Sequence, residues 1–140
     1  LYERDGVLSA LKARANIYPP LMKQALIGGL WEAGFSLENC HKPAARGDVT
    51  HVAGYLYRAA AVMTQTLFAL NERYCINEKG AVKLVDSFPL HPSRFSERVS
   101  GILAHIGAAP DELNASVQQF EALLQETHAL CDTQYTHIIG

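Results

Sequence analysis

The sequence predicts an all-α protein, arranged as an antiparallel four-helix up-and-down bundle with one or two short accessory helices. Apolar residues recur at helical spacing along nearly the whole chain, and hardly any window alternates strictly between apolar and polar residues as a strand would. The length of 140 residues and the 49% hydrophobic content fit one ordinary globular domain. We therefore expect residues 1–140 to form a single helical domain with its own core.

The first part of the chain predicts a short helix followed by a longer one. Asp5 can cap the short helix, and the break at residues 18–20 ends it because a residue before proline is pushed out of the helical region. Pro20 suits the first turn of the second helix, whose apolar stripe reaches Cys40 in four- and three-residue steps. Pro43 either kinks this helix or splits off a last turn.

The third helix is the strongest predicted element. Asp48 or Thr50 can cap it, and its apolar stripe extends from Val52 to Tyr74 at alternating four- and three-residue steps. At 1.5 Å per residue it would be about 40 Å long, enough to span a bundle. We expect it to be the central helix.

Polar and proline-containing breaks divide the rest of the chain. Residues 77–80 form a polar break, and residues 81–88 can form an accessory helix. The next helix starts at Pro92 or Ser93 and ends at Gly107, and Pro110 opens the last one. The inward-facing residues expected in these two helices are Phe95, Val99, Ile102 and Ile106, then Leu113, Val117, Phe120, Leu124 and Cys131.

Composition narrows the class of protein and its compartment. The three cysteines are odd in number and lack CxxC spacing, which favours a reducing compartment, and we expect the cytoplasm. A net charge of -2 gives no overall attraction to nucleic acid or anionic membranes. Arg58 and Gln65 interrupt the most apolar run, so no membrane span is expected. His128 and Cys131 lie one helical turn apart without a second pair, so no metal site is expected.

The third helix carries a second stripe that could bind a ligand. The chain has no phosphate-binding Gly-rich loop, HExxH or GxSxG motif, which lowers the odds that it is an enzyme by itself. The ring of Tyr55, the guanidinium of Arg58 and the amide of Gln65 are groups that hold a planar or anionic molecule in a cleft. The alternative is that they hydrogen-bond one helix to another. The whole stripe comprises His51, Tyr55, Arg58, Val62, Gln65, Ala69 and Glu72.

Further polar candidates lie around this helix. Arg46 precedes it and can recognise a phosphate or carboxylate, or be a solvated turn charge. Residues 77–80 either terminate a helix or form a ligand-facing loop. Glu32, on the second helix, can act as a general base if it lies in a cleft, or can be a surface carboxylate.

Two Arg/His pairs match the Arg-x(4 to 6)-His spacing of HEPN-type helical ribonucleases. They are Arg46 with His51, and Arg98 with His105. With seven arginines and six histidines in the chain, about one such match is expected by chance. A HEPN-type ribonuclease or toxin-like module, dimeric across a symmetric groove, is therefore one alternative function.

An ordered string of short motifs resembles the helical C-terminal domain of bacterial putative nucleotidyltransferases. The likeness runs through most of residues 1 to about 106. The helical domain of this family is similar to the substrate-binding half of the kanamycin nucleotidyltransferase group, and the family borders on the HEPN-like helical domains. The motifs are Tyr18-Pro19-Pro20-Leu21, Leu30-Trp31-Glu32-Ala33, Ala45-Arg46-Gly47-Asp48-Val49, Gly54-Tyr55-Leu56-Tyr57-Arg58-Ala59, Leu67-Phe68-Ala69-Leu70-Asn71 and Asn77-Glu78-Lys79-Gly80.

The resemblance implies one half of an enzyme. A nucleotidyltransferase domain with a Gly-Ser turn and paired aspartates would bind ATP or another nucleoside triphosphate with Mg²⁺. The helical domain would hold a small-molecule acceptor against it. This chain contains neither motif and begins at Leu1, so we expect a domain excised from a larger protein, with no cofactor of its own.

The resemblance also implies roles for single residues. Glu32 is the candidate base that removes the acceptor's proton. Arg58 and Lys79 would face nucleotide phosphates or an anionic acceptor, and Tyr55 and Asn71 would orient the bound molecule. A homodimer and a non-catalytic helical interaction domain remain alternatives. The full set of expected binding residues is Arg46, Tyr55, Arg58, Asn71, Asn77, Glu78 and Lys79.

Overall fold

The structure is a computed structural model, which describes residues 6–8 and 17–139, and only the backbone of residues 134–139. These residues contain helices and no strand, which confirms the all-α prediction for them. The helix expected after Asp5 falls largely outside them, although residues 6–8 are helical. The helices named below are α2 Pro20–Gly28, α3 Trp31–Glu38, α4 His41–Ala45, α5 Val49–Leu70, α6 Ala81–Val85, α7 Phe95–Ala104 and α8 Pro110–Ile139.

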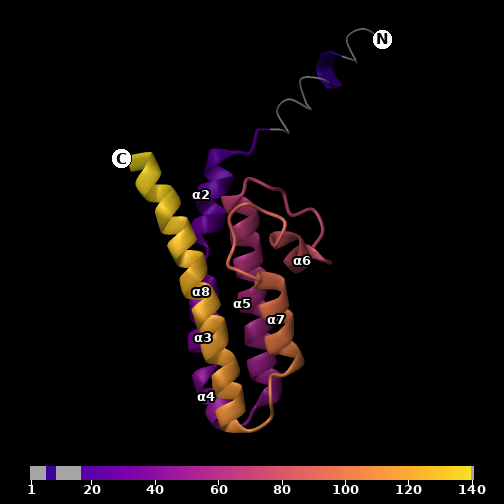
Figure 1. Cartoon of the computed structure of the whole chain (residues 1–140), viewed down its shortest axis with the longest axis vertical. Coiled ribbons are helices and arrows are strands. Elements are labelled where there is room, and N and C mark those ends of the chain that lie inside the picture. Colours follow the sequence, from indigo (N-terminus) through magenta and orange to yellow (C-terminus); the bar gives the residue numbers. More distant parts are fainter. Residues whose placement is uncertain (1–5, 9–16, 140) are drawn as a thin grey trace.

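Helix α5 is the element around which the others pack. It contacts α2, α3 and α4 on one side and α6, α7 and α8 on others. Figure 1 shows α8 running lengthwise beside it, α7 covering its lower part and α6 lying at the edge. The finer arrangement, an antiparallel four-helix bundle, stays a prediction, because three short helices replace one of its expected long ones.

The prediction of one continuous helix from Pro20 to Cys40 is wrong. It is divided into α2 and α3 at Gly29 and Leu30. Two consecutive glycines have low helix propensity, and burial of Leu30 in the core favours a change of direction there. The turn split off near Pro43 is confirmed as α4, with the proline in the first turn, where its missing N–H is tolerated.

Helix α5 begins as expected and ends early. The Asp48 carboxylate caps it by accepting the N–H of His51 at 3.2 Å, and this bond is the main cause that lowers the pKa of Asp48. The helix has 22 residues, so it is about 33 Å long. The prediction that Tyr74 continues its stripe is wrong. The chain leaves the helix after Leu70, and Glu72 takes a left-handed conformation at φ 55°.

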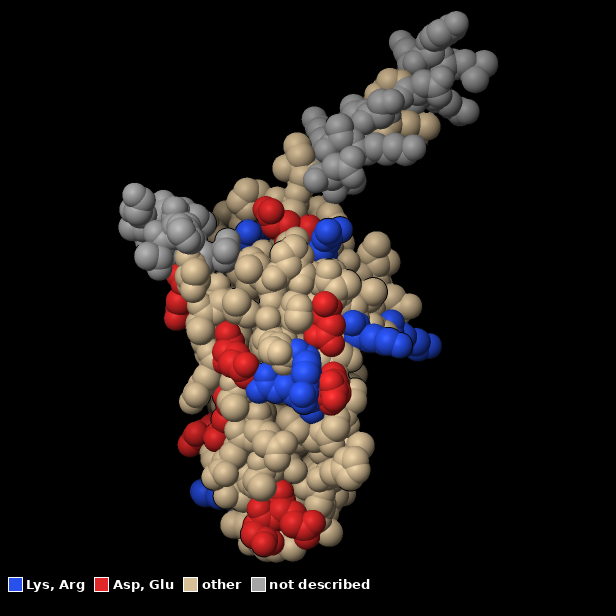
Figure 2. Space-filling view, viewed as in Figure 1, with Lys and Arg blue, Asp and Glu red and all other residues tan. Residues whose placement is uncertain are grey.

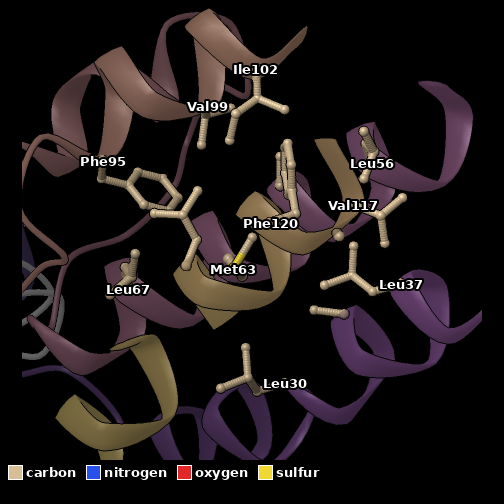
Figure 3. Packing of buried hydrophobic residues seen from close by; sticks show 14 of the residues in the cluster. Leu30, Leu37, Leu56, Met63, Leu67, Phe95, Val99, Ile102, Val117 and Phe120 are labelled. Carbon is tan, nitrogen blue, oxygen red and sulfur yellow. The ribbon is translucent and has the colours of Figure 1, made fainter. Parts of the chain in front are cut away.

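The core lies between α5, the α2–α3 segment, α7 and α8. Figure 3 shows Met63 of α5 among apolar side chains that come from all of these segments, such as Leu30, Phe95 and Phe120. Most expected inward positions are buried. Of those expected in α7 and α8, Ile106 and Leu124 are only half-buried, because α7 ends before Ile106 and Leu123 takes the inward place on α8.

Candidate functional site

A cavity of about 490 Å³ lies beside the middle of α5. Helix α5 forms its floor, chiefly through Tyr57, Ala61 and Gln65. Because α2 and α3 pack on one flank of α5 and α6 and α7 on another, the cavity has two walls. The α2–α3 wall consists of Ala25, Leu26, Gly29 and Glu32, and the α6–α7 wall consists of Cys75, Glu78, Ala81, Val82, Val99, Ser100 and Leu103.

The break between α2 and α3 shapes the first wall. The Thr66 hydroxyl of α5 donates to the Leu26 carbonyl at 3.3 Å, which fixes the end of α2 against α5. Gly29 then lines the cavity at the break, where no side chain fills the space. Glu32 follows in the first turn of α3, a position at which the helix dipole favours a carboxylate. Glu32, expected either in a cleft or as a surface carboxylate, lines the cavity with a side chain that is 43% exposed.

Arg58 reaches this wall without lining the cavity. Its Nη2 donates to Oε2 of Glu32 at 3.5 Å, and both side chains are substantially exposed. Such a solvent-exposed ion pair is weak and easily exchanged for another partner. Arg58 therefore lies at the edge of the cavity, and its charge faces Glu32, a carboxylate that lines the cavity.

A tight turn places the second carboxylate. The Asn77 side chain accepts the N–H of Lys79 at 3.0 Å, and Gly80, at φ 77°, then leads into α6. This turn sets Glu78 on the cavity wall next to Cys75, whose thiol lies 3.9 Å from the carbonyl of Asn77. These residues were expected to form either a helix terminus or a ligand-facing loop. Asn77 shapes the turn, and Glu78, although exposed, lines the cavity.

Two other cavity residues act on the Cys75 thiol. Burial is the largest cause that raises the pKa of the Cys75 thiol. A hydrogen bond with the Gln65 side chain opposes this rise, and the charge of Glu78 adds to it. Gln65 of α5 and Glu78 of the loop therefore both lie near the Cys75 thiol.

Other predicted residues lie elsewhere. Tyr55 and Arg58 line a separate, shallow hollow of about 280 Å³ on α5, together with Thr50, His51 and Gly54. Arg46 is exposed at the turn between α4 and α5, and Lys79 is exposed beside Glu78. The predicted polar stripe of the central helix is thus split, since only Val62 and Gln65 of it line the main cavity.

The Asn71 amide contacts the backbone of its own chain. Its Nδ2 donates to the carbonyl of Leu67 at 2.8 Å and to that of Leu90 at 2.7 Å, while its Oδ1 accepts the N–H of Leu90 at 2.9 Å. These bonds tie the segment before α7 to the end of α5. A role in orienting a ligand stays a prediction for this residue.

At least one member of each Arg/His pair has a local partner. Arg98 binds the Glu126 carboxylate with both terminal nitrogens and the carbonyl of Ser93 at 3.1 Å, and the Glu126 bond is the main cause that raises its pKa. His51 lies 3.0 Å from the Asp48 carboxylate that caps α5. Figure 2 shows basic side chains adjoining acidic ones at the centre of one face, without a broad basic field.

Neither a membrane span nor a metal cluster is found among the described residues. None of their helices combines the length and apolarity that crossing a bilayer requires. They also contain no group of three or more His, Cys, Asp or Glu side chains arranged to hold a metal ion. Comparisons of the chain with protein-family models, with curated proteins and with solved structures found no significant match.

Sequence reasoning missed the apolar part of the cavity. Most of its lining consists of alanine, valine and leucine side chains, such as Ala61, Val82 and Leu103, whose types carry no chemical signal. The glycine pair at residues 28–29 is the one sequence feature that points to a gap between helices, because it breaks the second helix where the cavity begins.

Proposed function

We propose that this chain is the acceptor-binding helical domain of a nucleotidyltransferase, and that the cavity beside α5 holds the acceptor. A nucleoside monophosphate is transferred to that acceptor from a nucleoside triphosphate, which is bound with Mg²⁺ by a nucleotidyltransferase domain of the same protein. The fold in this proposal is an antiparallel four-helix bundle, with α2 to α4 counted as one helical segment. The order of elements in Figure 1 supports it.

The observation that carries the proposal is that Glu32 and Glu78 line one cavity. Both were singled out from sequence, one as a candidate base and one as a binding residue, and they belong to separate elements. The cavity volume of about 490 Å³ is within the range of small-molecule sites. Mostly apolar walls with a few polar groups are also usual for such sites.

Each polar side chain at the cavity has its own role in the transfer. Glu32 accepts the proton of the acceptor's hydroxyl, the acceptor oxygen bonds to the α-phosphorus, and the bond to the bridging oxygen breaks to release pyrophosphate. Gln65 orients the acceptor through its amide, since it lines the cavity. Arg58 and Lys79, both exposed, face the phosphates.

Filling the cavity tests the proposal. Ala61 is an exposed residue on the cavity floor, so Ala61→Trp occupies the space without disturbing the buried core. The assay uses the full-length protein with ATP, Mg²⁺ and a protein-free extract of small metabolites. We expect this variant to lose at least about 90% of metabolite-dependent pyrophosphate release, because the acceptor can no longer enter the cavity. Circular dichroism should show unchanged helicity.

The matched control is Ala115→Trp, an exposed position on α8 that does not line the cavity. This variant should release pyrophosphate like the unmodified protein. Equal activity of both tryptophan variants would count against the cavity as the acceptor site. Cleavage of added RNA that is lost in His51→Ala, with no pyrophosphate release, would instead favour the HEPN-type alternative.

A further inference from the structure

We infer that the ligand of the cavity is an organic ammonium ion, with an apolar body, one protonated amine and the hydroxyl that receives the nucleotide. This inference rests on the proposed function, because it takes the cavity to be the acceptor site. It names the chemical class of the acceptor. Three features of the cavity carry it, namely the sign of its charged groups, the character of its surface and the position of the nearest cation.

The charged groups that line the cavity are acidic. Glu32 lies on the α2–α3 wall and Glu78 on the α6–α7 wall, while none of the described lining residues is a lysine, arginine or histidine. Two carboxylates in a partly enclosed space produce a negative potential, which attracts a cation and repels an anion. An acceptor that itself carries a phosphate or carboxylate would therefore be disfavoured in this cavity.

The surface between the two carboxylates is apolar. Ala60 and Ala61 of α5, Val82 of α6, and Val99 and Leu103 of α7 line it. The Thr64 hydroxyl, which also lines the cavity, donates to the carbonyl of Ala60 at 2.7 Å, so this donor is already used. An apolar body gains from leaving water here, whereas a wholly hydrophilic molecule would leave this surface unmatched.

The cation that contacts a carboxylate of the cavity is Arg58, at the cavity edge. Arg58 donates to Glu32 at 3.5 Å and so competes with a bound amine for that carboxylate. Among the described residues no cation pairs with Glu78, an exposed carboxylate on the other wall of the cavity. Glu78 is therefore the stronger anchor for the amine, and removal of the Arg58 charge should strengthen binding rather than weaken it.

A series of equal-sized probes tests the inference. Hexylammonium, 1-hexanol and hexanoate are titrated into the 140-residue chain and followed by amide chemical shifts in NMR spectra. We expect hexylammonium to bind about 10-fold more tightly than hexanoate and about 3-fold more tightly than 1-hexanol, as partly exposed charges allow. Glu78→Gln should weaken hexylammonium binding about 3- to 10-fold, and Arg58→Gln should strengthen it about 2-fold.

The control variant is Glu38→Gln, which removes an exposed carboxylate of α3 outside the cavity and should leave the affinity unchanged. Equal affinities for hexylammonium and 1-hexanol, no binding of any probe, or hexylammonium binding that neither Glu78→Gln nor Glu32→Gln weakens would each overturn the inference.

The same titration separates this inference from the proposed function. If ammonium binding shows the expected charge dependence while Ala61→Trp leaves pyrophosphate release intact, the transferase proposal fails and the ammonium site stands. If Ala61→Trp abolishes release and the probes show no charge preference, the ammonium inference fails and the transferase proposal stands.

Discussion

Asn71 joins two parts of the chain that are distant in sequence. Its amide makes three hydrogen bonds, of which two go to the backbone of Leu90, and the residue is half-buried. A polar backbone group that loses its partner at such a place costs more than the bond itself contributes, because it is shielded from water.

We expect Asn71→Ala to lower the free energy of unfolding by about 1–3 kcal/mol, since the N–H and carbonyl of Leu90 lose their partner. Urea unfolding followed by circular dichroism measures the change. Asn114→Ala, at an exposed position of α8, is the control and should change stability by less than about 0.5 kcal/mol. Equal effects of the two substitutions would contradict a structural role for Asn71.

Residue types and the family resemblance singled out two residues of the cavity lining. Glu32 and Glu78 could be found because a carboxylate in a polar pattern suggests chemistry, and both line the cavity. Asn71 and Asn77 belong to the same motif string, yet their side chains bind backbone groups of this chain. Whether an amide meets a ligand or a backbone depends on contacts between distant segments, which spacing along the chain does not encode.

At the scale of elements, glycines end helices or weaken them according to their conformation. Gly107, at φ 89°, forms the turn before α8, and a Cβ built on it would come within 2.4 Å of the Glu112 Cβ. Gly101 lies inside α7, exposed, and a Cβ there would meet nothing within 4 Å. The same substitution should therefore have opposite effects at these two positions.

We expect Gly101→Ala to raise the free energy of unfolding by about 0.5–1 kcal/mol, because alanine is the better helix former. Gly107→Ala should lower it by about 1–3 kcal/mol, because of the positive φ and the contact with Glu112. Thermal unfolding of the two variants beside the unmodified chain measures both. Shifts of the same sign would mean that the backbone at one of these glycines differs from the structure.

Element boundaries were predictable where a local signal decides them. Asp48 caps α5 through its own side chain, and Pro110 opens α8, as their positions suggested. The early end of α5 was not predictable, because Tyr74 fits the helical spacing but stacks on Tyr18 with ring centroids 5.0 Å apart. The burial of Tyr18 comes from long-range packing, which overrides the local pattern.

At the scale of the whole molecule, the cavity results from packing several short elements on one long helix. Helical periodicity predicted the all-α class, because it is repeated along the chain. The cavity could not be predicted in the same way, since its walls come from α2, α3, α6 and α7 and depend on how each leaves the surface of α5. The positions of the breaks between helices were the feature of the sequence that pointed to the cavity.

An apolar probe has a second place to bind, on the outer face of α3. Trp31 and Phe35 are exposed there, with ring centroids 6.2 Å apart. Leu21 of α2 is exposed as well. Exposed apolar groups of this kind can bind hydrocarbon chains non-specifically, without a cavity. The location of a bound probe therefore matters as much as its affinity.

The most direct test is to locate bound hexylammonium by intermolecular nuclear Overhauser effects to the methyl and aromatic protons of the chain. The account predicts effects from the probe's methylene groups to Ala61, Val82 and Leu103, all of which line the cavity, and their loss in Ala61→Trp. Effects only to Trp31 and Phe35, unchanged by Ala61→Trp, would contradict it.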